Sequence, residues 1–192
     1  TSPLMSFRKN QLLELIQGSI GGVLGGLGLE HLGIVFMPLA LALLWSACKK
    51  PLAGFIWGLV AVLISHRWLL SLHPLSWVGV PPSLSLPIAI SIWLFCGLLA
   101  GLLVCLWCLV GQFNFLTRVK DGGPFEEFFY VLLLASIWGL GELTLARLPF
   151  FWIGIEVSLL PGDRAFAGLA RLFGAGGLAA FCLLFSYWIR HL

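Results

Sequence analysis

The sequence predicts an all-α fold: a polytopic transmembrane helical bundle of about six helices, with an interfacial or re-entrant segment between helices five and six. Apolar residues make up 60% of the chain, charged residues only 10%, and the mean hydropathy is +1.04. A soluble domain carries roughly 25% charged residues. Because a membrane span needs about 20 mostly apolar residues, six spans with short loops use nearly all 192 positions. Residues 1–192 are therefore expected to form a single transmembrane domain.

The expected spans follow the apolar segments that lack Lys, Arg, Asp and Glu. One such segment, 68–117, is too long for a single helix and must be divided. Its part 71–83 is dense in Pro and Gly, which predicts a turn-rich loop, so the fourth helix should begin near Leu86. The charge-free segments that predict spans are 15–29, 32–48, 51–65, 86–110, 128–141 and 172–189. The helix that begins at Phe128 is expected to continue to Leu148.

Two local patterns refine this bundle. Gly18, Gly22 and Gly26 recur at a spacing of four in the first span, which predicts a face that another helix can approach closely. Between the fifth and sixth spans, the aromatic residues up to Trp152 lead into the apolar segment 153–160. This segment is too short to span and rich in aromatic residues, so it is expected to be interfacial or re-entrant.

The distribution of basic residues predicts a topology with both termini in the cytoplasm. This orientation leaves the loops 67–85 and 147–171 on the same non-cytoplasmic side, where a site shared between them would open outward. Seven basic residues then lie inside and four outside. The inside residues are Arg8, Lys9, Lys49, Lys50, Arg118, Lys120 and Arg190, and the outside residues are Arg67, Arg147, Arg164 and Arg171.

Glu142 is the least expected residue in the sequence, because it falls inside a predicted span where an unpaired carboxylate costs at least a few kcal/mol. It therefore needs a partner or a proton. Arg147 is about 140° away around an ideal helix, so Arg67 or Arg171 from another helix is an equally plausible partner. Two interpretations stay open: Glu142 lines a polar cavity or substrate path, or it forms a structural ion pair near the interface.

His66, Arg67 and Trp68 end the third span, and His73 follows in the loop. The imidazoles could serve as metal or pigment ligands or as an acid/base pair, whereas the alternative is that these residues anchor the helix at the interface. The nine Trp and fifteen Phe residues suggest extensive lipid contact. No cofactor is expected, and the five Cys lack the second ligand pair that a structural zinc site needs. The scattered basic residues argue against nucleic acid as a partner.

Several motifs occur in an order that resembles the N-terminal transmembrane part of apolipoprotein N-acyltransferases. The resemblance is collinear over nearly the whole chain, although each motif is short and apolar. There are two departures: Leu145 stands where the family usually has Arg, and the family's Phe-Pro-Trp appears as Pro-Phe-Phe-Trp. The motifs are Gly54 to Gly58, Ser65 to Trp68, Gly79 to Pro81, Trp138 with Glu142 four residues later, and Pro149 to Trp152.

The resemblance implies a membrane-embedded portion of an acyltransferase of the bacterial inner membrane that binds phospholipid or lipoprotein acyl chains. In this family a further span and a nitrilase-like extracytoplasmic domain with a Glu-Lys-Cys set follow, and that domain transfers an acyl chain through a thioester. No catalytic residue can be assigned to this sequence, where that domain is expected to be absent. The candidate polar or lipid-path residues are Glu142, Arg147, His66, Arg67, Trp68, His73, Trp138 and Trp152.

The main alternative is a non-catalytic integral membrane subunit or assembly factor of a larger membrane complex. A pigment- or quinone-associated version of that subunit would use His31, His66 or His73. The expected partners are membrane lipids, together with a lipoprotein substrate or a larger membrane protein complex. A small-solute transporter is less consistent with the sequence, because no pair of matching broken helices marks two inverted repeats.

Overall fold

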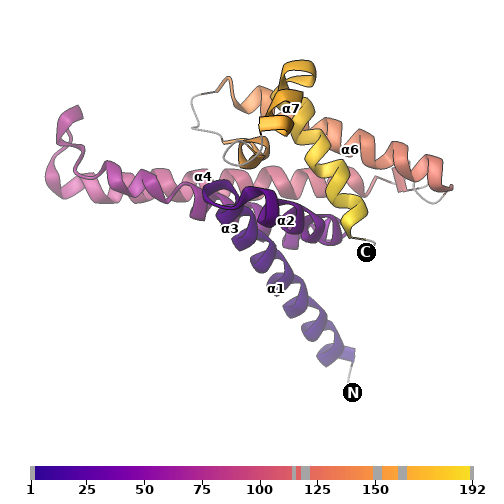
Figure 1. Ribbon diagram of the computed structural model, residues 1–192. Helices are drawn as coiled ribbons and strands as arrows, with labels where there is room; N and C mark the ends of the chain where they lie inside the picture. Colours follow the sequence, from indigo (N-terminus) through magenta and orange to yellow (C-terminus); the bar gives the residue numbers. More distant parts are fainter. Residues whose placement is uncertain (1–2, 114–115, 118–121, 149–152, 160–163, 191–192) are drawn as a thin grey trace.

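The computed structural model describes residues 3–113, 116–117, 122–148, 153–159 and 164–190, and these residues form helices and connecting turns with no strand among them (Figure 1). The predicted all-α class is confirmed, and each of the six expected spans coincides with an α-helix. The α-helices are α1 (Pro3–Glu30), α2 (Gly33–Ala47), α3 (Pro51–Ser65), α4 (Pro82–Gly111), α6 (Pro124–Leu145) and α7 (Arg164–Ile189). Three 3-10 helices connect them: η1 (Arg67–Leu72), η2 (Leu75–Val78) and η3 (Ile155–Leu159).

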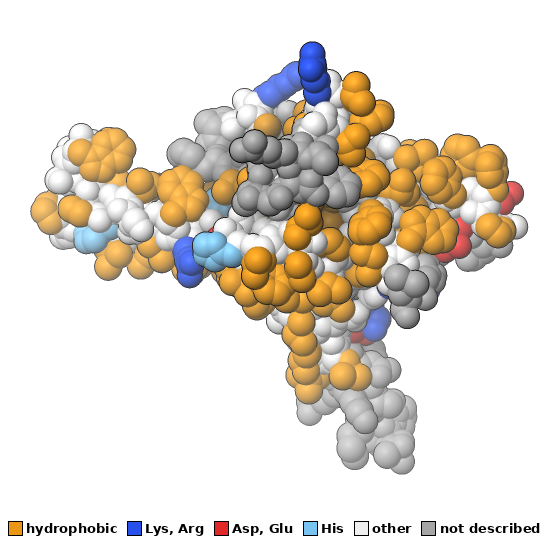
Figure 2. Space-filling view, in the orientation of Figure 1, with side chains coloured by type: hydrophobic (Ala, Val, Ile, Leu, Met, Phe, Trp, Pro, Cys, Tyr) orange, Lys and Arg blue, Asp and Glu red, His pale blue; other side chains and the backbone are white. Residues whose placement is uncertain are grey.

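Four helical segments are long and apolar enough to cross a membrane: Gln11–Glu30, Pro82–Gly111, Pro124–Leu145 and Gly168–Ile189. The other two, α2 and α3, have 15 residues each, about 22 Å at 1.5 Å per residue, against a hydrocarbon core of about 30 Å. Hydrophobic side chains spread over the visible surface of the bundle, as expected for contact with lipid (Figure 2).

Helices α1 and α3 run parallel and pack backbone to backbone through the glycine face of α1. A Cβ atom on any of these glycines would lie within 3 Å of an atom of α3, so a larger residue would push the helices apart. The two helices keep one register: each of the three glycines lies against the α3 residue that is 35 positions later in the sequence. The close pairs are Gly18 with Ala53, Gly22 with Trp57, and Gly26 with Ala61. The predicted close approach is confirmed.

Two ion pairs join α1 to residues that flank α3, near the two ends of this interface. Glu14 contacts Lys50 with an oxygen–nitrogen distance of 2.8 Å, and Glu30 contacts Arg67 at 2.8 Å. The same parallel register therefore places opposite charges together at both ends. Helix α2 connects α1 to α3 in sequence and packs mainly against α1. The side chain of Trp57 on α3 donates to the carbonyl of Ala40 on α2 at 3.0 Å.

Helix α4 begins at Pro82, four residues before the predicted start at Leu86, so that boundary was wrong. Proline fits the first helical turn because its missing N–H would be unpaired there anyway. The predicted turn-rich loop before α4 consists of η1, η2 and the left-handed Gly79. Figure 1 shows that this loop and the beginning of α4 extend well beyond the ends of the other helices.

The helices alternate in direction, and their ends meet in two groups. At one end, the Gln112 amide donates to the Cys48 carbonyl at 3.1 Å and the Tyr187 hydroxyl donates to Glu127. At the other end, Arg67 pairs with Glu30, and Gly33 lies directly against the Ser158 carbonyl. Residues 67–81 and 153–159 therefore lie at the same end of the bundle.

Four tryptophans form the centre of the core. The ring centroids are 6.4 Å apart for Trp57 and Trp138, 5.3 Å for Trp138 and Trp107, and 5.0 Å for Trp107 and Trp45, all in edge-to-face geometry. Trp45, Trp57 and Trp107 each donate their indole N–H to a backbone carbonyl of another helix, which satisfies the polar atom within the protein. These four tryptophans are buried in the core, so the lipid contact suggested by the many aromatic residues does not apply to them.

Candidate functional site

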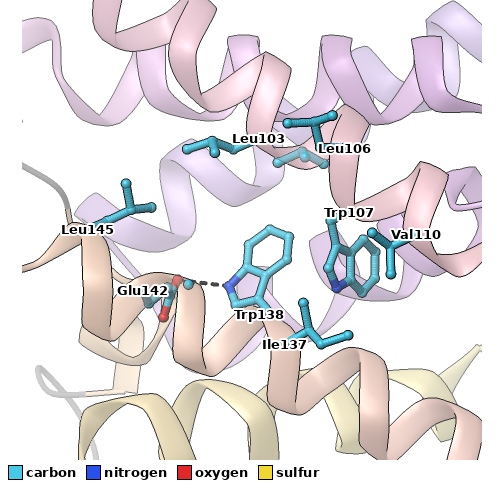
Figure 3. Close-up of a pocket in the computed structure, with 10 residues that line it drawn as sticks. Leu103, Leu106, Trp107, Val110, Ile137, Trp138, Glu142 and Leu145 are labelled. Carbon is cyan, nitrogen blue, oxygen red and sulfur yellow. Dashed lines mark hydrogen bonds between the residues drawn. The ribbon is translucent and has the colours of Figure 1, made fainter.

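The carboxyl group of Glu142 lies inside the bundle, three residues before the end of α6, and the side chain is only 5% exposed. Its Oε1 accepts a hydrogen bond from the indole N–H of Trp138 at 2.9 Å and one from the backbone N–H of Ile155 at 3.0 Å. Trp138 is one helical turn earlier, where residues four apart share a face (Figure 3). The structure thus brings together two of the residues that the sequence selected.

A second carboxyl group faces the first. Glu156 lies on η3, and its carboxyl group is near enough to Glu142 for the two to interact. The Oε2 atoms of both residues are buried, and no described residue outside the pair donates a hydrogen bond to them. Sequence reasoning missed Glu156, although the signal that selected Glu142 was present: it is the one acidic residue in the apolar segment 149–160.

The segment that carries Glu156 is folded into the bundle. Ile155, Ser158 and Leu159 are buried, and the Ser158 hydroxyl donates to the Ile155 carbonyl at 2.6 Å, closing a tight turn. This turn points the Ile155 N–H at Glu142 and packs Ser158 against Gly33 at the start of α2. The described part of this segment, 153–159, thus packs into one end of the bundle against α2 and α6.

An apolar cavity of about 220 Å³ lies between α4 and α6 (Figure 3). Glu142 is near one end of it, and the α6 part of its wall continues from Leu145 to Ile137, about 12 Å along the helix at 1.5 Å per residue. The side chains that line it are otherwise aliphatic or aromatic. They are Leu103, Val104, Leu106, Trp107, Val110, Ile137, Trp138, Gly141, Glu142 and Leu145.

A second cavity, of about 350 Å³, lies on the other side of Glu142, between α6, α7 and the segment 153–157. Both carboxylic acids line it, and its remaining walls are small or apolar residues. These are Leu143, Ala146, Ile153, Gly154, Val157, Ala175 and Gly176. Glu142 is thus shared by an apolar cavity and a cavity with two carboxyl groups.

The four sequence-selected residues near η1 have other partners. His66 is buried and its Nδ1 is 2.9 Å from the Ser65 hydroxyl. Arg67 pairs with Glu30, as described above, and Trp68 is 40% exposed. His73 Nδ1 is 2.7 Å from the hydroxyl of Ser85, which also accepts from the backbone of η2. These contacts fix the loop onto α4.

Arg147 lies exposed on the turn after α6 and forms no ion pair within the described ranges, where the two recorded pairs are those at the ends of the α1–α3 interface. Trp152 lies outside the described residues. Among the residues that the structure places, no group of three or more His, Cys, Asp or Glu side chains could hold a metal ion. The arrangement around Glu142 is suited to binding: it offers an apolar cavity with polar groups near one end.

These features define an integral helical membrane protein with two partly open, largely apolar pockets that share one buried carboxyl group. The chain is similar over nearly all of its length to apolipoprotein N-acyltransferases, which confirms the resemblance seen in the sequence. It is 58% identical to "Apolipoprotein N-acyltransferase" of Prochlorococcus marinus (strain MIT 9313) over 92% of the chain. It is 50% identical to the protein of that name from a second strain of P. marinus over 97%, and 49% identical to that of Parasynechococcus marenigrum (strain WH8102) over 93%.

The alignment covers a minor part of each relative: 36%, 38% and 37% of these three proteins, respectively. No protein-family model matches the chain. No solved structure matches it. The homology places the chain among bacterial inner-membrane proteins.

Proposed function

We propose that this chain is the membrane-embedded portion of an apolipoprotein N-acyltransferase and that its apolar cavity binds the acyl chain of a phospholipid or lipoprotein substrate. The observation that carries the proposal is the cavity between α4 and α6, whose lining is apolar except for Glu142. An acyl chain gains free energy of about 25 cal/mol per Å² of apolar surface that leaves water. A chain that enters the cavity from a bilayer leaves lipid and not water, so this gain is absent. Binding must then come from close packing against the cavity wall.

The cavity also suits an amphiphile because of where its polar end lies. Glu142 is three residues, about 4.5 Å along the axis, from the end of α6, which places it towards the end of a spanning helix. The aliphatic wall extends from there towards the middle of the helix. A lipid could therefore place its chain between α4 and α6 with its polar part near Glu142.

The proposed topology has both termini in the cytoplasm, which follows from the excess of basic residues predicted there. The alternation of helix ends supports it, because residues 67–81 and 153–159 lie together at one end and Lys50 lies at the other. With this orientation Glu142 faces the non-cytoplasmic half of the membrane. In this family the acyl acceptor, a lipoprotein, would be approached from that half.

Gly141→Leu tests acyl-chain binding. A Cβ atom at Gly141 meets no atom within 4 Å, yet the residue lines the cavity, so leucine should fill the cavity without moving the backbone. We expect at least about a tenfold loss of lipid binding, equivalent to roughly 1.4 kcal/mol, measured by native mass spectrometry or by labelling with a lipid that carries a photoreactive acyl chain.

Gly168→Leu is the matched control. It makes the same substitution on α7, at an exposed position where a Cβ atom is also unobstructed and which does not line the cavity. Lipid binding should be unchanged in this variant. If both variants bind the photoreactive lipid as the parent protein does, the cavity is not the acyl-chain site.

A further inference from the structure

We infer that Cys48 and Cys108 form a redox-active thiol pair, which a quinone dissolved in the membrane oxidises to a disulfide between α2 and α4. The evidence begins with the contact between the two side chains. Cys48 follows the last residue of α2, Cys108 lies near the end of α4, and their thiols are in hydrogen-bond contact. All five cysteines of the chain are thiols in this structure. The pair is separate from the proposed acyl-chain site, because neither cysteine lines the apolar cavity.

One side chain binds the backbones of both cysteines. The amide nitrogen of Gln112 donates to the carbonyl of Cys48 at 3.1 Å and to the carbonyl of Cys108 at 3.3 Å. A disulfide forms only between cysteines whose Cα atoms lie within about 7 Å of each other, and a group that holds both backbones favours that alignment. The sulfur atoms are already in contact, so a small movement brings them to the S–S bond length of about 2.05 Å.

Glycines of two helices face the sulfur atoms. A Cβ on Gly54 of α3 would lie 2.5 Å from the sulfur of Cys108, and a Cβ on Gly111 of α4 would lie 3.1 Å from the sulfur of Cys48. A side chain at Gly54 would therefore collide with the first sulfur, and one at Gly111 would press on the second. The neighbouring backbones thus leave a space that the thiol pair occupies.

The number of ligands at this position favours a disulfide over a metal ion. A structural zinc site takes four ligands, whereas this position offers two contacting thiols. Among the residues that the structure describes, no group of three or more His, Cys, Asp or Glu side chains could hold a metal ion. Two contacting thiols can instead lose two hydrogens and form one S–S bond.

The burial of the pair selects the class of oxidant. Cys48 is 5% exposed and Cys108 has no exposed surface, so a water-soluble disulfide such as oxidised glutathione has poor access to either sulfur. A quinone dissolves in the hydrocarbon of the membrane and accepts two electrons with two protons. In the balanced step, both S–H bonds break and one S–S bond forms, while the two hydrogens reduce the quinone to its hydroquinone.

The disulfide would add a covalent link between α2 and α4. Helix α4 packs mainly against α3, and it contributes Trp107 and Val110 to the wall of the apolar cavity. These two residues flank Cys108 in the sequence, so the link would fix the part of α4 that forms this wall. It would also close a long loop of chain, which removes conformations from the unfolded state and stabilises the folded one.

The test treats the purified chain in liposomes with duroquinone, a fully methylated quinone that oxidises thiols without ring substitution. Peptide mapping by mass spectrometry should find Cys48 joined to Cys108 in most molecules, and dithiothreitol should separate them. The midpoint of thermal unfolding, measured in detergent, should rise by at least about 5 °C on oxidation and return to its starting value on reduction.

Cys105→Ser is the matched control, because Cys105 lies three residues before Cys108 on the same helix and is partly buried. This variant should retain both the joined peptides and the rise in unfolding temperature. Cys48→Ser and Cys108→Ser should each lose both, and either variant is sufficient if the other fails to fold. A parent chain without the joined peptides, a link through Cys105, or an unchanged unfolding temperature after linkage would overturn the inference.

Discussion

At the scale of single residues, Trp138 and Glu142 form the most informative contact in the molecule. Other core tryptophans donate to backbone carbonyls of neighbouring helices, whereas Trp138 donates to a side-chain carboxyl oxygen on its own helix. A hydrogen bond to a charged or buried acceptor fixes the orientation of both side chains. Glu142 is thereby held at the junction of the two cavities, with one oxygen anchored and one oxygen available.

Trp138→Phe should lower the free energy of unfolding by about 0.6–2 kcal/mol, the range for hydrogen bonds between side chains in membranes. The loss should shrink when Glu142→Leu is already present, because the acceptor is then gone. Reversible unfolding in bicelles, arranged as a double-mutant cycle, measures this coupling.

Trp45→Phe is the control for that cycle. Trp45 donates to the backbone carbonyl of Leu183 at 2.9 Å. Trp45→Phe should therefore lower the free energy of unfolding by the same amount with and without Glu142→Leu. Equal coupling of both tryptophans to Glu142 would show that the effect is general loosening of the core, and not the Trp138 bond.

At the scale of helices, the α1–α3 interface depends on glycines that leave room for the backbone of the neighbouring helix. Small residues allow helices in a membrane to approach closely, which increases packing and compensates for the missing hydrophobic driving force. Helices α6 and α7 cross in the same way, because a Cβ on Gly139 or Gly176 would collide with the other's carbonyl. Gly141, two residues after Gly139, meets nothing.

Gly22→Ala and Gly141→Ala should therefore change stability in opposite directions. The Cβ at residue 22 would lie 2.7 Å from the Trp57 carbonyl oxygen, and such overpacking costs about 1–3 kcal/mol. The Cβ at residue 141 is unobstructed, so alanine should add up to about 1 kcal/mol from helix propensity.

Thermal unfolding in detergent, with the parent protein as reference, measures the change in stability of both variants. A stabilising Gly22→Ala would mean that α1 and α3 are not packed this closely.

At the scale of the whole molecule, the sequence was sufficient for the helices but not for their pairing. Charge-free apolar segments located all six helices, and the spacing of Gly18, Gly22 and Gly26 identified a close interface. Neither feature indicates which helix packs against the glycine face of α1, because its partner, α3, lies 35 residues away in the sequence. Glu156 was missed for the same reason: its meaning comes from a second carboxyl group on another element. The start of α4 was misplaced because proline permits both a turn and a first helical turn.

The predicted topology can be tested with single added cysteines and a membrane-impermeant maleimide. Ser76→Cys and Arg147→Cys should react in cells whose outer membrane alone is permeable, since both positions are exposed and belong to the proposed non-cytoplasmic side. Lys49→Cys, also exposed, should react only after the inner membrane is permeabilised.

The parent chain is the background control, because four of its five native cysteines are buried and Cys105 is partly buried. The reverse labelling pattern would place both termini outside. Labelling of Ser76→Cys and Lys49→Cys from the same side would contradict the alternation of the helices.

The glycine register between α1 and α3 also has a consequence for biogenesis. Helix α3 is only 15 residues long, so on its own it is a weak candidate for release from the translocon into lipid. Its partner α1 emerges 35 residues earlier, about 2–7 seconds at ribosomal speeds of 5–20 residues per second. During that delay the glycine face of α1 is in the membrane without its partner helix α3. We expect α1 to act as an intramolecular template, so that weakening its glycine face would first appear as failed insertion of α3 during synthesis.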